Sequence, residues 1–130
     1  ATLTPALAIK DKRPFLSFAV QGGDTQDQNL LQFFLNMVEF EMNVQEAAEA
    51  ANVNSYQMYS SFGTHSKEAG RIVVRDDTPP WVIKDLRSKG YNVVTRRLTS
   101  GPINAIWFDH KNGTMWGGSS NFGEDYGIGW

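Results

Sequence analysis

Two adjacent glycines, Gly22 and Gly23, have the residue type and the position to stabilise a negative charge. They join a strand-like segment at residues 14–20 to a helix-like segment that begins near residue 28. Glycines leave the backbone N–H groups uncovered, and such groups beside a helix N-terminus can stabilise an anion, including the oxyanion of acyl transfer. A tight strand-to-helix turn that needs positive φ would also explain the pair.

The other polar and aromatic candidates have ordinary structural explanations. His65 and His110 are the only histidines, and neither has a second ligand at the spacing of a metal site. Asp76 and Asp77 precede a predicted helix, where carboxylates are electrostatically favoured. The chain has no cysteine, which excludes disulfides and a cysteine nucleophile. We therefore expect no metal site and no cofactor, and we expect most of the four tryptophans to pack in the core.

The elements that must position these residues follow from the apolar periodicity. The predicted strands lie at residues 6–11, 14–20, 53–62, 71–75, 91–96, 103–108 and 114–116. The predicted helices lie at residues 28–41 and 43–51 and from about Pro79 up to Gly90, which is predicted to be the C′ residue of the third helix. Asn43 and Glu46 have capping-box spacing, as do Thr25 and Gln28. The first helix has apolar residues on more than one face, so we expect it to be sandwiched between layers.

Turn signals between these segments predict hairpins and hence an α+β fold with a largely antiparallel sheet. Asn112-Gly113 is the strongest hairpin signal, and residues 11–13 suit another. The 130 residues and 41% hydrophobic content fit a single domain over residues 1–130. The net charge of -2 gives no basic footprint for nucleic acid or an anionic membrane. Residues 1–20 do not fit a signal peptide, so a cytoplasmic location is slightly favoured over a secreted or periplasmic one.

Several segments in a fixed order resemble the gamma-glutamyltransferase family, and specifically the C-terminal part of its small subunit. The first three are Leu-Thr-Pro-Ala at 3–6, Val-Gln-Gly-Gly-Asp-Thr-Gln at 20–26 and Met-Asn-Val-Gln-Glu-Ala at 42–47. The stretch from Pro80 to Val93 and the ending Gly-Ile-Gly-Trp at 127–130 are also similar to the family's pattern. The resemblance covers nearly the whole chain.

The resemblance implies an N-terminal-nucleophile hydrolase. Members are made as precursors that cut themselves, and the new N-terminal threonine attacks a gamma-glutamyl amide before water or an amine takes the acyl group. The implied fold is a four-layer αββα sandwich shared by two subunits, to which this chain would contribute a C-terminal fragment. The nucleophile would lie upstream of this chain, so the chain alone is predicted to be inactive.

Two roles are carried over from the family to residues of this chain. Gly22 and Gly23 resemble the two glycines whose N–H groups form the oxyanion hole, and they are the predicted catalytic residues. Thr2 resembles the second of two serines that bind the substrate carboxylate, with Ala1 at the position of the first.

The residues after the glycines distinguish this chain from the best-known transferases. Asp-Thr-Gln at 24–26 replaces Ser-Arg-Ile, and Ser-Ser-Asn-Phe at 119–122 replaces the usual Ser-Asp-x-Arg. These differences favour the branch of gamma-glutamyltransferase-like proteins and related acylases. Three alternatives to a gamma-glutamyl enzyme stay open: an acylase acting on a non-glutamyl amide, an inactive structural or binding domain, and a free-standing α+β domain.

The expected partners are the rest of the parent enzyme, meaning the large subunit and the N-terminal part of the small subunit. The expected ligand is a small gamma-glutamyl or related amide, with no nucleic acid and no membrane. Without the rest of the sandwich, the apolar face around Phe33, Phe34 and Met37 would be exposed. We therefore expect the isolated chain to self-associate.

Overall fold

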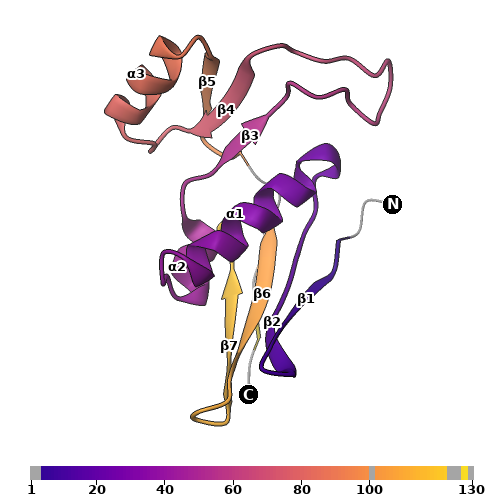
Figure 1. Cartoon of the computed structure of the whole chain (residues 1–130), viewed down its shortest axis with the longest axis vertical. Helices are drawn as coiled ribbons and strands as arrows, with labels where there is room; N and C mark the ends of the chain where they lie inside the picture. Colours follow the sequence, from indigo (N-terminus) through magenta and orange to yellow (C-terminus); the bar gives the residue numbers. More distant parts are fainter. Residues whose placement is uncertain (1–3, 100–101, 123–126, 129–130) are drawn as a thin grey trace.

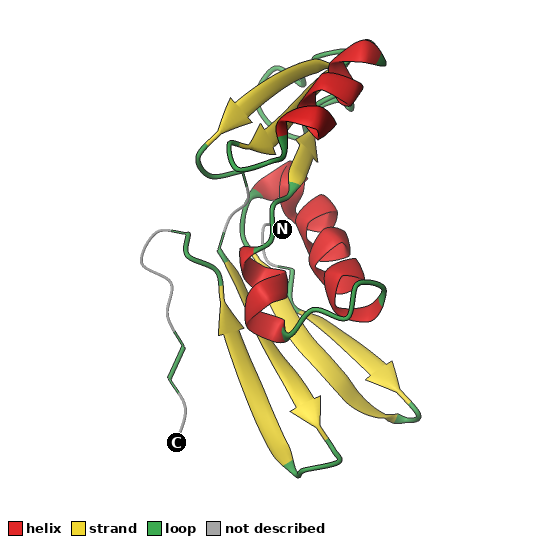
Figure 2. Cartoon of the chain, turned by 90° about the vertical axis from the view of Figure 1, so that its left-hand side faces the viewer, coloured by secondary structure: helices red, strands yellow, loops and turns green. Residues whose placement is uncertain are grey.

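The larger of two sheets carries the segment that leads into the glycine pair. The computed structural model describes residues 4–99, 102–122 and 127–128. The strands of the larger sheet, sheet A, are β1 (Ala6–Lys10), β2 (Arg13–Val20), β6 (Ile103–Asp109) and β7 (Thr114–Ser119). They pair in the order β1-β2-β6-β7, and every pair is antiparallel (Figure 1). Two helices, α1 (Gln26–Val38) and α2 (Val44–Glu49), cover one face of sheet A (Figure 2).

A smaller sheet, sheet B, follows α2 in the chain. Its strands are β3 (Val53–Ser55), β4 (Arg71–Arg75) and β5 (Asn92–Arg96), in that order. β3 and β4 are antiparallel, whereas β4 and β5 are parallel because α3 (Pro80–Ser88) connects them as a crossover. The predicted α+β class and mostly antiparallel pairing are confirmed, with β4–β5 as the parallel exception.

The main core lies between sheet A and the two helices on it. Its buried members are Leu16, Val20, Phe33, Val44, Ala47, Ala48, Ile103 and Ala105. Phe33 is 1% exposed, and the ring of Phe18 lies 5.6 Å from it and 6.1 Å from the ring of Phe34. Sheet A therefore covers the helix face that was expected to be exposed, and that expectation is wrong.

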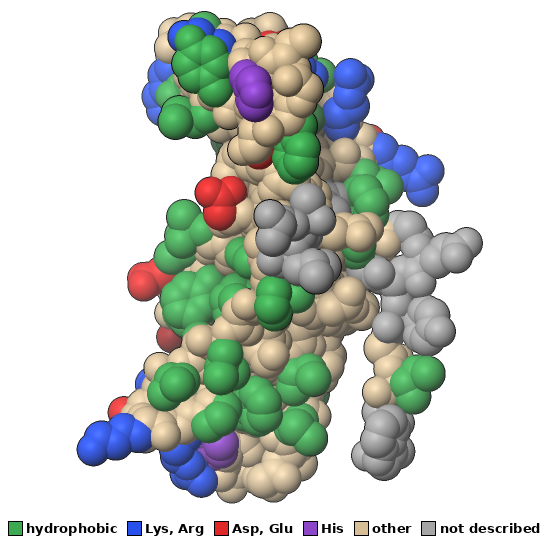
Figure 3. All heavy atoms as spheres, turned by 90° about the vertical axis from the view of Figure 1, so that its right-hand side faces the viewer, with side chains coloured by type: hydrophobic (Ala, Val, Ile, Leu, Met, Phe, Trp, Pro, Cys, Tyr) green, Lys and Arg blue, Asp and Glu red, His purple; other side chains and the backbone are tan. Residues whose placement is uncertain are grey.

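The outward side of α1 is open, so the helix covers the sheet rather than being sandwiched. Leu31 is 58% exposed and Leu35 is 36% exposed. The uncovered apolar surface of sheet A is instead its outer face, where Leu7, Ile106 and Met115 are exposed. Figure 3 shows hydrophobic side chains gathered over sheet A in the lower half of the molecule. Among the described residues, no helix has the length and apolar character needed to cross a bilayer.

Most of the predicted turns and caps are present. Asp11 and Lys12 have φ of 51° and 63°, which closes the β1–β2 hairpin as expected. The Asn43–Glu46 capping box is confirmed, with Asn43 Oδ1 accepting from the N–H of Glu46 at 2.9 Å. Gly90, with φ of 91°, follows the C-cap residue of α3. The β6–β7 hairpin is also confirmed.

The β6–β7 turn is longer than the two residues that Asn112-Gly113 suggested. Gly113 has positive φ (67°), and the turn is held by Asp109, which lies at the end of β6. Asp109 Oδ1 accepts from the N–H of Lys111 at 3.1 Å and from that of Asn112 at 3.2 Å. A hydrogen bond from the Asn112 side chain is the main reason that the pKa of the Asp109 carboxyl lies below its usual range.

Two further expectations are wrong. The predicted strand at residues 53–62 ends at Ser55, and the chain continues as a loop up to β4. Two of the tryptophans expected in the core are exposed, Trp81 by 72% and Trp116 by 55%.

Candidate functional site

The glycine turn begins where β2 leaves the core. Val20, the last residue of β2, is buried, and its carbonyl oxygen accepts two side-chain hydrogen bonds. Gln26 Nε2 donates to it at 2.9 Å and Thr4 Oγ1 donates at 2.8 Å. Because Gln26 is the first residue of α1, this contact fixes the end of the strand against the start of the helix.

Gly22 and Gly23 both adopt a backbone conformation that favours glycine. Gly22 has φ of 141° and Gly23 has φ of 59°. Neither backbone N–H donates a hydrogen bond to another residue in the described part of the chain. Gly22 is exposed and Gly23 is half-buried, so both N–H groups can be reached by a ligand. The structure therefore places two adjacent donors directly before a helix N-terminus, where the helix dipole adds positive potential.

The Thr25 side chain stabilises the glycine turn and does not cap α1. Its hydroxyl donates to the carbonyl oxygen of Gly22 at 3.0 Å, and no side-chain cap bond to α1 forms. A short 3-10 turn (Gly23–Thr25) precedes α1. The expected capping box between Thr25 and Gln28 is thus wrong, because Gln28 reaches the other sheet instead.

Gln28 and Gln32 attach β3 to α1 through paired side-chain hydrogen bonds. Gln28 Oε1 accepts from the N–H of Ser55 at 2.7 Å, and its Nε2 donates to the Ser55 carbonyl oxygen at 3.1 Å. Gln32 does the same for Val53, with both distances 2.8 Å. Two glutamines one helical turn apart therefore satisfy the free edge of β3 as a neighbouring strand would.

Asp24 ties the long loop after β3 to the glycine turn. Its Oδ2 accepts from Ser60 Oγ at 3.0 Å and from the N–H of Ser61 at 2.8 Å. These hydrogen bonds from Ser61 and Ser60, with a smaller contribution from the charge of His65, hold the pKa of the Asp24 carboxyl below its usual range. The carboxylate is therefore ionised at neutral pH and directed toward the loop.

Phe62 from the same loop lies against Gly23. A Cβ atom at position 23 would lie 2.9 Å from Phe62 Cε2, so the ring edge occupies the space that any other side chain would need. The sequence analysis missed Asp24, Ser60 and Phe62 as site residues. No local signal could have found them, since the hydrogen bonds between Asp24 and the loop span 36 and 37 positions.

The remaining predicted candidates lie apart from the turn or outside the described residues. Thr2, the predicted carboxylate-binding residue, is outside the described ranges. Asp77 pairs with Arg75 at the end of β4, a structural role that differs from the expected one at the helix N-terminus. His110 lies in the β6–β7 turn, and its Nε2 atom is 2.6 Å from the carbonyl oxygen of Pro14. Within the described part of the chain, no group of three potential ligands could hold a metal ion.

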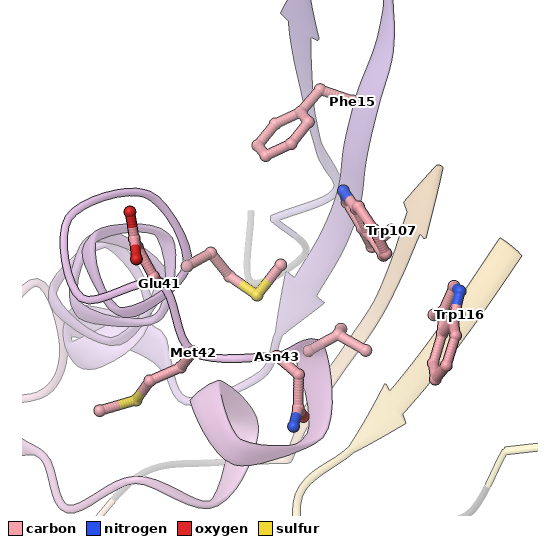
Figure 4. Close-up of a pocket in the computed structure, with 8 residues that line it drawn as sticks. Phe15, Glu41, Met42, Asn43, Trp107 and Trp116 are labelled. Atoms are coloured by element: carbon pink, nitrogen blue, oxygen red, sulfur yellow. The ribbon is translucent and has the colours of Figure 1, made fainter. Parts of the chain in front are cut away.

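A pocket of about 410 Å³ lies at the other end of α1 (Figure 4). It is lined by Phe15, Met37, Glu41, Met42, Asn43, Val44, Trp107 and Trp116. The lining is mostly apolar, and Glu41 is its one ionisable group. Since α1 has 13 residues at about 1.5 Å each, the pocket and the glycine turn are separated by about the length of this helix, roughly 20 Å. It offers no nucleophile and is not the predicted site.

Comparison with known proteins gives matches over the whole chain. The model of the family described as Gamma-glutamyltranspeptidase matches residues 1–130. The chain is 29% identical over 130 residues to the glutathione hydrolase proenzyme of Bacillus subtilis, covering 98% of this chain and 20% of that protein. It is 27% identical over 116 residues to the Acylase ACY 1 proenzyme of a Pseudomonas species, covering 89% of this chain and 18% of that protein.

The fold is also that of a solved relative. A crystal structure of acivicin-inhibited gamma-glutamyltranspeptidase superposes with a TM-score of 0.77 at 22% identity, over 95% of this chain and 62% of that chain. This likeness confirms the fold expected for the C-terminal portion of the αββα sandwich. The chain spans about a fifth of the length of the two curated relatives.

Proposed function

This chain belongs to the gamma-glutamyltranspeptidase family, and we propose that it supplies the oxyanion-binding turn of an amide-hydrolysing or acyl-transferring enzyme. One observation carries the proposal. Gly22 and Gly23 both have positive φ, and they present two N–H groups with no acceptor among the described residues directly before α1. A structural turn needs positive φ but does not need two backbone donors without an acceptor.

The proposed role follows from the charge that acyl transfer creates. When a nucleophile attacks an amide carbonyl, the carbonyl π electron pair moves to the oxygen, which becomes negative in the tetrahedral intermediate. Two preorganised N–H donors stabilise that charge without reorganisation. The amine then leaves with a proton, and water or a second amine takes the acyl group.

The nucleophile in this proposal lies in a part of the parent protein that precedes this chain. Family membership supports an N-terminal threonine produced by self-cleavage. Thr2 is proposed to bind the substrate rather than to attack the carbonyl. No metal or cofactor takes part in the proposed steps.

The outer face of sheet A is the proposed contact with the rest of the parent enzyme. Leu7 and Ile106 lie in one row across this face, because each pairs in register with Ser17 of β2, and Met115 extends the face on β7. Their exposed fractions are 57%, 43% and 69%. An apolar sheet face of this kind fits a second sheet packed against it.

The test removes one N–H while leaving the side chains and the fold unchanged. In the full-length parent, glycolic acid is incorporated at position 22 or 23 by nonsense suppression, which replaces the amide N–H with an ester oxygen. We expect kcat for amide hydrolysis to fall by about 10²–10³ for either position, with KM less affected. The matched control is the same replacement at Gly113, which also has positive φ (67°) but lies in the β6–β7 turn.

Autocleavage is scored separately by gel, because a folding defect would stop both processing and turnover. A processed, folded glycolate variant at either position with near-normal kcat would return the glycines to a purely structural role. A parent protein that folds but has no amide-hydrolysing activity would favour the alternative of an inactive binding domain.

A further inference from the structure

The loop between β3 and β4 forms a wall beside the glycine turn. Residues 56–70 of this loop are fixed to the turn by the hydrogen bonds from Ser60 and Ser61 to Asp24. Two bonds within the loop support this arrangement: His65 Nδ1 contacts the Ser60 carbonyl oxygen at 2.9 Å, and the Ser60 N–H donates to the Ser66 carbonyl oxygen at 2.9 Å. A group bound by the Gly22 and Gly23 N–H groups would therefore meet this loop.

The wall carries large apolar side chains that the chain does not bury. Met58 is 82% exposed, Tyr59 is 66% exposed and Phe62 is 54% exposed. Phe62 is the closest of them to the turn, because its ring edge lies 2.9 Å from the position of a Cβ atom on Gly23. Clustered exposed apolar residues beside polar loop residues are typical of a ligand-binding surface.

The basic side chains of the loop are already engaged. The Lys67 ammonium lies 4.7 Å from the centre of the Tyr59 ring. The Arg71 guanidinium pairs with Glu68 and lies 4.9 Å from the centre of the Tyr56 ring. An uncharged substrate group would therefore suit this wall better than an anionic one.

We propose that this loop is the acyl-side wall of the site, and that Phe62 selects amide substrates with an apolar acyl group, aryl or extended alkyl, over a glutamyl group. The inference rests on the proposed function, because it takes the carbonyl oxygen of the substrate to be bound by Gly22 and Gly23. With the oxygen held there, the substituents of the carbonyl carbon would lie beside Gly23, where the Phe62 ring packs, and the proposal assigns this side to the acyl group. Phe62 is then a specificity-determining residue, and Asp24 is a positioning residue that acts through the loop.

The experiment uses the processed parent enzyme and three p-nitroanilides that differ only in the acyl group: phenylacetyl, acetyl and gamma-glutamyl. We expect the phenylacetyl compound to be the best substrate of the unaltered enzyme. Phe62→Ala should lower its kcat/KM by about 10–100-fold, mainly through KM, and change that of the acetyl compound less than about threefold. Phe62→Leu keeps apolar bulk and should retain most of the preference.

Phe40→Ala is the matched control, because Phe40 is also an exposed phenylalanine (67%) but follows the C-terminal end of α1. It should leave all three rates unchanged. A uniform loss with all three anilides in Phe62→Ala, no change with any of them, or a gamma-glutamyl preference that survives Phe62→Ala would overturn the assignment of the wall.

The glycolate variants separate failure of this inference from failure of the proposed function. If they are inactive and Phe62→Ala does not change the acyl preference, the oxyanion role stands and the wall assignment is wrong. If they are fully active, the proposed function is wrong and the inference is lost with it.

Discussion

Gly118→Ala tests whether the start of α2 packs on β7 as closely as the structure indicates. A Cβ atom at position 118 would lie 2.8 Å from the carbonyl oxygen of Val44 and 2.9 Å from its carbonyl carbon. Raising the shorter distance to the 3.4 Å at which ordinary contact begins requires α2 to move by about 0.6 Å. The obstacle is backbone, so no rotamer change can relieve it.

The start of α2 is held against such a movement. Gln45 Nε2 donates to the Ser119 carbonyl oxygen at 2.8 Å, and Gln45 Oε1 accepts from the Ser119 N–H at 3.1 Å. Overpacking of this kind costs about 1–3 kcal/mol, and weakening these hydrogen bonds adds about 1 kcal/mol. We therefore expect Gly118→Ala to lower the free energy of unfolding by about 2–4 kcal/mol.

Gly117→Ala is the matched control, since Gly117 is adjacent, lies on the outer face of sheet A and has nothing within 4 Å of a Cβ atom. It should be neutral or stabilising by up to about 1 kcal/mol, because alanine restricts the unfolded chain. Urea unfolding of the chain, followed by tryptophan fluorescence at low micromolar concentration, measures both. If the two variants unfold within about 0.5 kcal/mol of each other, the close contact between α2 and β7 is wrong.

Three further outcomes follow from the structure. Asn43→Ala should lower the free energy of unfolding in urea by about 1 kcal/mol. Thr25→Ala should lower it clearly less, because Asn43 forms a side-chain cap and Thr25 does not. NMR titration should give Asp24 a pKa below its ordinary value of 3.8, and Ser60→Ala, which removes the Oγ donor, should raise that pKa. Since the pKa is lowered in the folded state, the stabilisation by Asp24 is present above that ordinary value and is lost as the pH falls through the folded-state pKa. The isolated chain should associate in sedimentation, and Met115→Lys on the outer face should shift it toward monomer, whereas an unchanged profile would place the contact elsewhere.

The features that could be predicted from the sequence are those whose determinants are close together in the chain. The capping box of Asn43 and Glu46, the turn before β2 and the glycine after α3 each depend on a few consecutive residues. The glycine turn belongs to this group, because the strand before it and the helix after it both have clear apolar patterns. Its position and positive φ were therefore predictable.

The loop that completes the site could not be predicted. Tyr56, Met58 and Phe62 have the alternation of a strand, but pairing with β4 stops after the Tyr56 N–H, which donates to the Arg71 carbonyl oxygen at 3.1 Å, and hydrogen bonds within the loop follow. The Glu68 N–H, for example, donates to the Tyr56 carbonyl oxygen at 2.9 Å. The loop is positioned by hydrogen bonds to Asp24, which is far away in the sequence. A single sequence does not show with which distant carboxylate two serines form hydrogen bonds.

The exposed tryptophans have a related explanation. An apolar pattern shows which residues gain from burial, but it does not show what covers them. Trp81 on α3 and Trp116 on β7 lie in regular elements, as predicted, yet both are exposed. The expectation that they pack in the core of this chain was wrong because it took position in an element as evidence of burial.

The start of α1 connects the parts of the proposed site. Gln26 holds the end of β2, Gln28 holds β3, and Asp24, two residues before the helix, holds the loop that carries Phe62. The proposed oxyanion donors and the proposed acyl wall are therefore positioned by one segment of five residues, although the two come from distant parts of the chain. Because the loop is attached through the charged side chain of Asp24, which directly follows Gly23, the proposed acyl contacts and the two proposed N–H donors depend on the same segment.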